Sequence, residues 1–220
     1  QQASNIDLSV EWYPTTNTIA EATLYTKRIR NLVYTETANA IIDQEEVLLT
    51  QPVNGNRASL NGIDIHFRHK ITTGQNLFKG LGADVSVNLQ NSETRYRSEN
   101  TPRDTEIPLA PGQSYKVQLF HESTDLKVAL QWLFTGRQLL NYTDSGMDKY
   151  LQPYKTLDFM LMYRLASLTF NLQINNLLNQ PEFYKTLGKA KTYLGTQDDG
   201  GNGSYVETGR YASLYVSWNF

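Results

Sequence analysis

The sequence has 220 residues and a formal net charge of −2 at pH 7, with Lys and Arg scattered rather than clustered, which predicts no nucleic-acid partner. Cysteine is absent, so a disulfide scaffold and a thiolate metal site are both excluded. The mean hydropathy is −0.49 and no run of about 20 apolar residues occurs, so no membrane-spanning helix is expected. A transmembrane β-barrel stays compatible with these values, because its strands turn only alternate residues to lipid.

The first part of the chain predicts three long strands. Apolar and polar residues alternate strictly from Asn5 to Tyr13, and the segment 14–17 then makes a tight turn. The segment 18–34 is also strand-like, but its alternation weakens where Lys27, Arg28 and Arg30 occur, which predicts a strand whose far end leaves the sheet. A long mixed segment, 35–56, contains a Pro52…Asn54-Gly55 turn and precedes a third strand at 58–69.

The middle of the chain predicts five further strands. The clearest alternation of the whole sequence lies at Leu81–Gln90, and a long polar loop at 91–112 follows it. Two hairpins come next, separated by a loop at 138–154, and their four strands are predicted at 115–121 with 126–137 and at 156–164 with 167–176.

The last segment of the chain is one more strand, Gly209–Phe220. Its apolar face carries Ala212, Leu214, Val216, Trp218 and the terminal Phe220, and the intervening residues are Tyr, Ser or Asn. By itself this pattern fits a strand of a soluble sheet and a strand of an outer-membrane barrel equally well.

The lengths of the connections favour the membrane barrel. The connections at 14–17, 70–76, 122–125 and 165–166 are short, whereas those at 35–56, 91–112, 138–154 and 177–208 are long, and the two kinds alternate along the chain. Short turns at one rim and long loops at the other are typical of outer-membrane barrels. The strands of about 9–12 residues also suit a tilted span better than an ordinary soluble sheet. The predicted fold is an all-β, antiparallel up-and-down transmembrane β-barrel with about nine strands present.

Alternation does not determine which face of the strands meets lipid. The polar face mixes charged residues with small polar ones, as the wall of a wide lumen would, but the surface of a soluble sandwich would look similar. Two alternatives therefore stay open, a smaller self-contained outer-membrane barrel or porin and a soluble β-sandwich binding module. The larger polar residues of this face are Asp7, Glu11, Asp64, Arg68, Asp84, Lys116, Gln131, Arg137 and Arg164.

The carboxy-terminal part of the sequence carries a family resemblance. Residues 171–179 read Asn-Leu-Gln-Ile-Asn-Asn-Leu-Leu-Asn, and residues 207–211 read Glu-Thr-Gly-Arg-Tyr before the final aromatic strand. Both resemble the end of TonB-dependent outer-membrane receptors, and the strand, turn and strand at residues 9–31 are similar to a recurrent unit of the same family. The resemblance is specific at the carboxy-terminal end and looser between residues 35 and 160.

The resemblance implies a 22-stranded barrel with a plugged lumen. Residues 1–220 would form its carboxy-terminal portion, and the amino-terminal plug, the TonB box and the earlier strands would lie outside this chain. The implied location is the outer membrane of a Gram-negative bacterium, as a multi-pass protein. The implied function is TonB-dependent active uptake of a scarce nutrient, of the oligosaccharide or ferric siderophore class.

The resemblance also implies partners for the chain. These are the TonB complex, reached through the missing amino-terminal region, the outer-membrane lipid, the small-molecule nutrient and the barrel-assembly machinery. The final strand would be the assembly signal, because an amphipathic strand with an open edge can be captured by strand addition. The residues expected to form the signal are Tyr211, Leu214, Tyr215, Val216, Trp218 and Phe220.

No enzyme, cofactor or metal ion is predicted. His66 and His69 lie three residues apart on a strand and point to opposite faces, and the Asp- and Gly-rich segment 198–203 lacks the spacing of a calcium loop. Loop tyrosines are the candidates for nutrient binding, because Tyr makes large contacts on sugars or planar siderophores at a low ordering cost. The candidates are Tyr142, Tyr150, Tyr154, Tyr184, Tyr193 and Tyr205.

Overall fold

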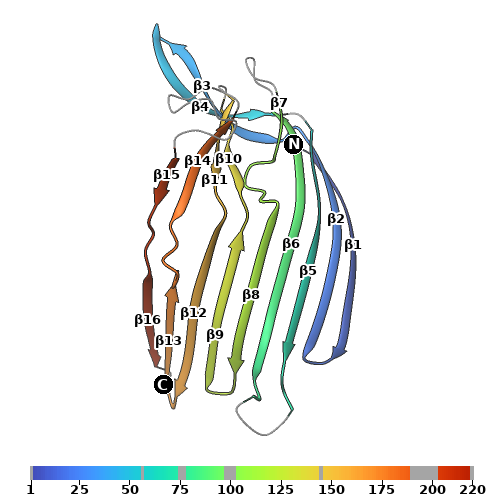
Figure 1. The fold of residues 1–220 in the computed structure, drawn as a ribbon, viewed down its shortest axis with the longest axis vertical. Coiled ribbons are helices and arrows are strands. Elements are labelled where there is room, and N and C mark those ends of the chain that lie inside the picture. The colour runs from blue at the N-terminus through green and yellow to red at the C-terminus, as the bar shows by residue number, and fades with distance from the viewer. Residues whose placement is uncertain are drawn as a thin grey trace.

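The computed structural model describes residues 2–55, 57–73, 78–96, 103–143, 146–188 and 203–218, and everything below refers to these residues. They form β-strands and their connections (Figure 1). Nine strands lie side by side in one antiparallel sheet, here called the wall, in the order β1-β2-β5-β6-β8-β9-β12-β13-β16. The wall strands are β1 Gln2–Thr15, β2 Thr18–Arg30, β5 Ala58–Lys70, β6 Leu81–Tyr96, β8 Gln113–Glu122, β9 Leu126–Thr135, β12 Tyr154–Leu165, β13 Leu168–Asn175 and β16 Tyr211–Trp218.

The wall confirms the predicted up-and-down antiparallel fold and its strand count. Each inner strand of the wall pairs with the wall strand before it and the one after it in the chain, as in a meander. The two edge strands, β1 and β16, do not pair with each other in the described part of the chain, so the nine strands form an open, curved wall (Figure 1). This arrangement fits part of a larger barrel. No helix long and apolar enough to cross a membrane occurs among the residues described.

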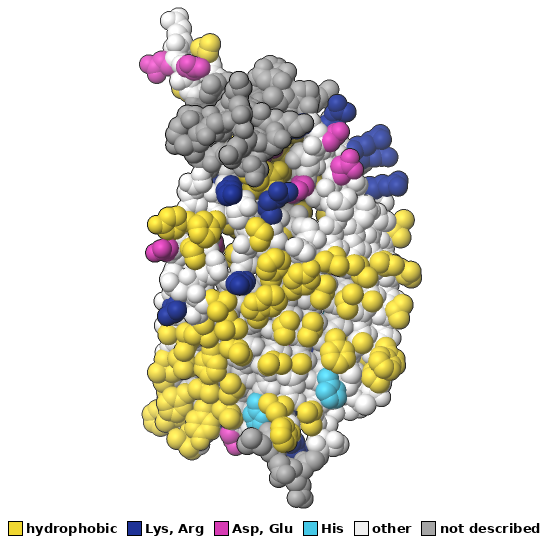
Figure 2. Space-filling model, in the orientation of Figure 1, with side chains coloured by type: hydrophobic (Ala, Val, Ile, Leu, Met, Phe, Trp, Pro, Cys, Tyr) yellow, Lys and Arg dark blue, Asp and Glu magenta, His cyan; other side chains and the backbone are white. Residues whose placement is uncertain are grey.

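The two faces of the wall differ in composition. On the apolar face, cross-strand neighbours such as Ile65 and Val87 or Leu172 and Leu214 lie side by side. Figure 2 shows this face as a broad hydrophobic band across the strands. Nothing described covers the band, and on the edge strands Ile6 is 70% exposed and Leu214 is 62% exposed. The opposite, polar face carries charged and amide side chains.

The long connections are more regular than the sequence predicts. The segment 35–56 lies mostly in a hairpin of β3 (Val33–Ile42) and β4 (Glu45–Asn54), joined at Asp43 and Gln44 with φ values of 53° and 71°. A two-residue turn with positive φ at both positions matches the right-handed twist of paired strands. The predicted turn at Pro52…Gly55 is therefore not the hairpin turn. Pro52 is part of β4, and the Gly55 amide closes the neck of the hairpin by donating to the carbonyl of Leu32 at 2.6 Å.

The other long connections contribute a second small sheet and a short strand. The sheet has the order β10-β11-β14-β15, and together with the β3–β4 hairpin and β7 it forms what is called the loop layer below. The short strand, β7 (Arg103–Thr105), pairs with the end of β6. The four strands of the small sheet are β10 Gln138–Asn141, β11 Met147–Leu151, β14 Glu182–Gly188 and β15 Gly203–Val206.

Several predicted strand ends are wrong by two or more residues, and the largest difference is at β6, which continues to Tyr96 where the sequence predicted an end at Gln90. β2 ends at Arg30 rather than at residue 34, and the chain then leaves the wall as expected. β9 ends at Thr135, so Arg137, predicted on the polar face of the wall, lies beyond the strand in the loop layer. There its guanidinium contacts Glu106 and the ring of Tyr150, which accounts for the different position.

Candidate functional site

The loop layer encloses an aromatic core. Tyr34 of β3, Tyr96 of β6 and Tyr142 after β10 meet there together with Leu139. The rings of Tyr96 and Tyr142 stack at 4.8 Å between centroids, and Tyr34 meets Tyr142 edge-on at 5.0 Å. Three segments that are distant in the sequence therefore contact one another in this core. The ring–ring contacts stabilise it beyond the contribution of the buried area.

A buried ion pair joins the same connections. The side chain of Asp148 in β11 is 6% exposed and pairs with Arg103 of β7, whose Nε lies 3.2 Å from Oδ2. The Arg103 guanidinium also lies over the ring of Tyr96, 4.6 Å from its centroid. The backbone amide of Thr143 donates to Asp148 Oδ1 at 2.9 Å. Hydrogen bonds from Arg103 and from the Thr143 amide offset the cost of burying the Asp148 carboxylate. The same bonds hold the loops in one arrangement.

Two of the six candidate tyrosines lie in or against this core and not on the accessible surface of the loop layer. Tyr142 is 1% exposed and its hydroxyl donates to the carbonyl of Glu106 at 2.9 Å. Burial, with a smaller contribution from the charge of Asp148, raises the pKa of Tyr142 well above its usual value. Tyr150 packs half-buried against the core beneath the guanidinium of Arg137, at 4.9 Å, and burial raises its pKa as well.

Two further candidates lie on the four-stranded sheet of the loop layer, on opposite faces. Tyr205 pairs with Phe183 across β14 and β15, their ring centroids are 6.0 Å apart, and Tyr205 is 62% exposed. Tyr184 follows Phe183 and therefore points to the other face, where Lys149 Nζ lies 5.1 Å from its ring centroid. The hydrogen bond from its hydroxyl to Glu182 raises the pKa of Tyr184.

The remaining two candidates do not join the others. Tyr154 begins β12 and lines a hollow of about 540 Å³ on the polar face of the wall, together with Lys116 and His66. Tyr193 lies outside the described residues. The six tyrosines therefore do not form one patch. Tyr34 and Tyr96, which no sequence signal marks, complete the aromatic core instead.

The polar face of the wall carries a compact charge cluster around Asp84. This carboxylate is 6% exposed, and its Oδ2 lies 3.4 Å from Arg68 and 3.5 Å from His66, while its Oδ1 lies 3.4 Å from Lys116. Arg68 and His66 belong to β5 and Lys116 to β8, the two strands that flank β6. The alternation of the strands brings them together, because residues paired across neighbouring strands share a face.

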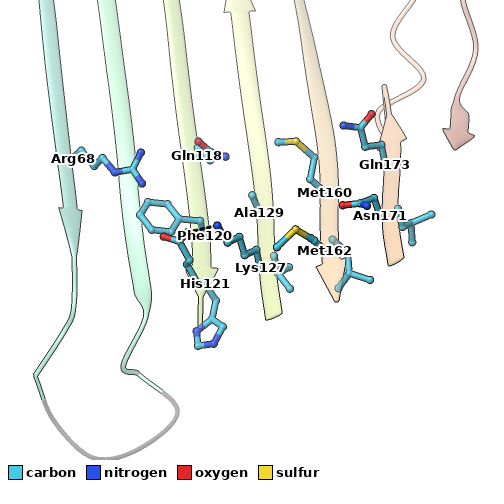
Figure 3. A pocket seen from close by; sticks show the side chains of 14 residues that line it. Arg68, Gln118, Phe120, His121, Lys127, Ala129, Met160, Met162, Asn171 and Gln173 are labelled. Carbon is cyan, nitrogen blue, oxygen red and sulfur yellow. Dashed lines mark ion pairs between the residues drawn. The ribbon is translucent and has the colours of Figure 1, made fainter. Parts of the chain in front are cut away.

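A second hollow, of about 330 Å³, lies beside this cluster on the same face (Figure 3). Phe120, Met160 and Met162 supply apolar surface, Arg68 lies at one side, and Lys127 lies between Phe120 and Met162. The guanidinium of Arg68 lies 4.8 Å from the ring centroid of Phe120. The ring fills the space above Gly82, where an added Cβ would come within 2.3 Å of it. The hollow is an apolar patch on an otherwise charged face.

A network of hydrogen bonds around Asn176 explains the two sequence motifs near the carboxy terminus. Asn176 is buried at the end of β13 with φ 54°, and its side-chain amide donates to the carbonyls of Gln180 and Gly209 at 3.2 and 3.1 Å. Its Oδ1 accepts from the amide of Gln180 at 2.9 Å. Arg210 Nε donates to the carbonyl of Leu177 at 3.0 Å. The Asn-Leu-Leu-Asn turn and the Gly-Arg-Tyr segment thus contact each other directly and set the entry of the last strand.

The predicted assembly-signal residues lie on β16, the open edge of the wall. Leu214, Val216 and Trp218 pair with Leu172, Phe170 and Leu168 on the apolar face, and Tyr211 and Tyr215 point to the polar face. The indole Nε1 of Trp218 donates to Ser167 Oγ at 2.9 Å. Phe220, the last member of the predicted signal, lies outside the described residues.

The described residues contain no group of three or more His, Cys, Asp or Glu side chains placed to hold a metal ion. The Asp84 carboxylate lies beside Arg68 and Lys116, and the Asp148 carboxylate beside Arg103 and the amide of Thr143. Their chemistry is that of structural ion pairs.

Comparisons with known proteins agree with this architecture. Residues 1–177 match the family model described as TonB dependent receptor-like, beta-barrel. Comparison with curated protein sequences gave no significant match.

Solved structures with the same fold include three transporters or receptors. One is the copper transporter OprC, with a TM-score of 0.63 and 14% identity over 99% of this chain and 31% of that one. Another is the FrpB iron transporter from Neisseria meningitidis (F3-3 variant), with a TM-score of 0.58 and 15% identity over 98% and 30%. The third is the ferric-catecholate import receptor Fiu from E. coli K12, with a TM-score of 0.59 and 15% identity over 97% and 27%. The chain thus spans about a third of the length of these structures.

Proposed function

Because the chain belongs to the TonB dependent receptor-like β-barrel family, we propose that it is part of an outer-membrane receptor that takes up a scarce nutrient with energy delivered through TonB. The chain itself is a multi-pass β-barrel protein of the Gram-negative outer membrane. The observation that carries the proposal is the family match over residues 1–177, supported by an antiparallel wall with one apolar and one polar face.

The two faces of the wall divide the proposed roles. The apolar face meets lipid, since its exposed side chains would otherwise lie in water. The polar face lines the lumen, where the Asp84 cluster and the hollow beside Phe120 are available to a plug that precedes this chain in the full receptor. The long-loop rim faces outward from the cell and the short-turn rim faces the periplasm.

The proposed partners follow from this arrangement. TonB would engage the receptor through its amino-terminal region, and the barrel-assembly machinery would recognise β16 by its open edge and apolar row. Deletion of Phe220 from the full-length receptor tests the assembly role, with the amount inserted in the outer membrane as the readout. Unchanged insertion would argue against it.

The nutrient is proposed to be an oligosaccharide or a ferric siderophore, bound at the loop layer. Tyr205 is the exposed candidate on the small sheet, Tyr184 lies half-buried on the other face of that sheet, and Tyr154 lines the lumen below it. Tyr193 stays in the proposal from its position in the sequence. Because Tyr142 and Tyr150 pack in the core, we expect them to support the loops that carry the contacts.

Uptake assays with the full-length receptor test the function. Cells that lack the receptor are supplied with candidate glycans or ferric chelates, with and without a functional TonB. We expect the receptor to restore uptake of one class only when TonB is active. Uptake that is independent of TonB would favour a passive porin, the alternative function. Ligand binding that survives removal of residues 138–154 and 177–208 would exclude the loop layer as the binding site.

The described strands fit the alternatives less well. A soluble sandwich requires a second sheet across the apolar face, and among the residues described no such sheet covers it. A self-contained barrel of nine strands requires pairing between β1 and β16, which the described residues do not form.

A further inference from the structure

Four arginines gather at the long-loop end of the wall, on three neighbouring strands or their immediate flanks. They are Arg28 and Arg30 of β2, Arg57 before β5, and Arg95 of β6, and all four are exposed. They border a hollow of about 690 Å³. Figure 2 shows a group of basic side chains at the upper right, beyond the hydrophobic band and separated from it by polar surface.

The strand register puts this arginine patch on the apolar face. Leu24 pairs with Leu8 and Ile63 in the hydrophobic band, and Arg28 follows four residues later on the same side of β2. Arg28 pairs with Ser59, which pairs with Glu93, so the row continues across β5 and β6. Lys27 lies between these positions and therefore points into the lumen.

The patch has more positive charge than its own carboxylates neutralise. Four arginines and two carboxylates, Glu93 and Asp104, line the hollow, which gives a net charge of +2. The ion pair of Arg95 with Asp104 is long, at 3.9 Å, and both side chains are more than 60% exposed. For Arg28, Arg30 and Arg57, no described carboxylate lies within ion-pair distance.

Three layers succeed one another along each of these strands. On β2 the outward residues run Arg28, Thr26 and Leu24, and each step of two residues advances about 7 Å along the strand. On β5 Asn61 lies between the arginine end and Ile63, and it contacts Thr26. On β6 Asn91 occupies the same level, next to Asn61. Charge, then hydroxyl and amide groups, then apolar side chains match the phosphate, the polar headgroup and the acyl chains of a membrane lipid.

We propose that the arginine patch is a binding site for the phosphate-bearing headgroup of an anionic lipid in the outer leaflet, with the acyl chains lying on the apolar band. Guanidinium groups bind phosphate oxygens in a bidentate fashion and keep their charge at the membrane surface. Basic side chains at the headgroup level attract anionic lipids. The site lies on the outside of the wall and is separate from the nutrient path, so it does not depend on the proposed uptake.

The test uses the full-length receptor in detergent and native mass spectrometry, with lipid A, phosphatidylglycerol, phosphatidylcholine or inorganic phosphate added as separate probes. The variant is Arg28→Gln with Arg30→Gln, and the matched control is Lys27→Gln on the same strand. At about 1 kcal/mol per basic residue near a membrane surface, we expect about fivefold weaker binding of the anionic lipid for each arginine removed. The control should bind it unchanged.

Several outcomes would overturn the proposal. The first is that the double glutamine variant binds lipid A or phosphatidylglycerol as strongly as the native receptor does. The second is that Lys27→Gln loses as much anionic-lipid binding as the double variant. The third is that the native receptor binds phosphatidylcholine as strongly as it binds the anionic lipids. Full competition by inorganic phosphate would also overturn it, because it would identify a site for a free anion. If the glutamine variant does not insert, Arg28→Lys with Arg30→Lys retains the charge and removes the bidentate geometry. Weaker lipid binding by that variant supports the proposal, and native binding contradicts it. Nutrient uptake, measured in parallel, should be native-like in every arm.

Discussion

Side chains of the wall are mostly exposed or half-buried on both faces, whereas the loop layer encloses its own core of Tyr34, Tyr96, Leu139 and Tyr142. In the wall, order comes from long regular registers, such as the thirteen consecutive pairs from Ala58–Thr94 to Lys70–Gly82 between β5 and β6. In the loop layer the strands are mostly short, and contacts between side chains of distant connections hold the structure together. The wall is therefore held together mainly by backbone pairing, and the loop layer mainly by side-chain packing.

This difference shows what each region needs from outside. No described residue covers the apolar band of the wall, and in the proposed receptor lipid buries this band while the plug fills the lumen. The loop layer buries aromatic rings and the Arg103–Asp148 pair without help from either. We expect substitutions in one region to leave the other intact, and the following predictions test that separation from the largest effect to the smallest.

The largest effect is expected for Tyr142→Ala in the loop core. Removing a fully buried aromatic ring costs about 3–5 kcal/mol, so the loop layer should lose its fixed arrangement. Protease treatment of intact cells should then cleave the loops rapidly, while the amount of receptor in the outer membrane stays native. Tyr205→Ala, at an exposed position, is the control and should change neither. Loss of membrane insertion in Tyr142→Ala would contradict the separation of the two regions.

The matching change in the wall is Ile65→Arg. A charge on the lipid face near mid-membrane costs about 2–4 kcal/mol, so insertion should fall. The neighbouring His66→Arg places the same side chain on the lumen face and should insert normally. Insertion is measured by heat-modifiable migration on a gel. Equal insertion of both variants would mean that the apolar face does not meet lipid.

A smaller effect is expected where the two regions meet, for Asn176→Ala. The change removes hydrogen bonds that join the 177–180 turn to Gly209 and leaves buried partners unpaired, at a cost of about 1–3 kcal/mol. Thermal unfolding should occur at a lower temperature, and protease should cut before β16. Asn175→Ala, one residue earlier on the polar face, should unfold close to the native temperature. If both variants behave alike, the network at Asn176 has no special role.

The smallest effect is expected for Arg137→Gln in the loop layer. Its ion pair with Glu106 measures 3.1 Å, but the side chains are 47% and 39% exposed, so solvent screens the interaction. Exposed pairs contribute about 0–1 kcal/mol, and less at high salt. Loop protease resistance should therefore be almost native at all ionic strengths. A large loss would show that the stacking of Arg137 on Tyr150 matters more than the charge pair.

The sequence predicted the wall well, because a strand that is apolar on one face shows its period of two directly. Each of the nine predicted strands overlaps a wall strand, and the apolar row of β16 pairs as expected from Ala212 to Trp218. The family itself is confirmed by the match over residues 1–177, and the hydrogen bonds of Asn176 join the two segments at 171–179 and 207–211 that carried the resemblance.

Only the tertiary structure decided the organisation of the loops and the position of the candidate side chains. The sequence suggested six loop tyrosines as one class, and the structure divides those it describes among a buried core, two faces of a small sheet and the lumen wall. The reason is that contacts such as Tyr96 with Tyr142 or Arg103 with Asp148 join residues more than forty positions apart. Strand periodicity is a local property and can be read from neighbouring residues, whereas the burial of a loop side chain depends on which distant connection folds over it.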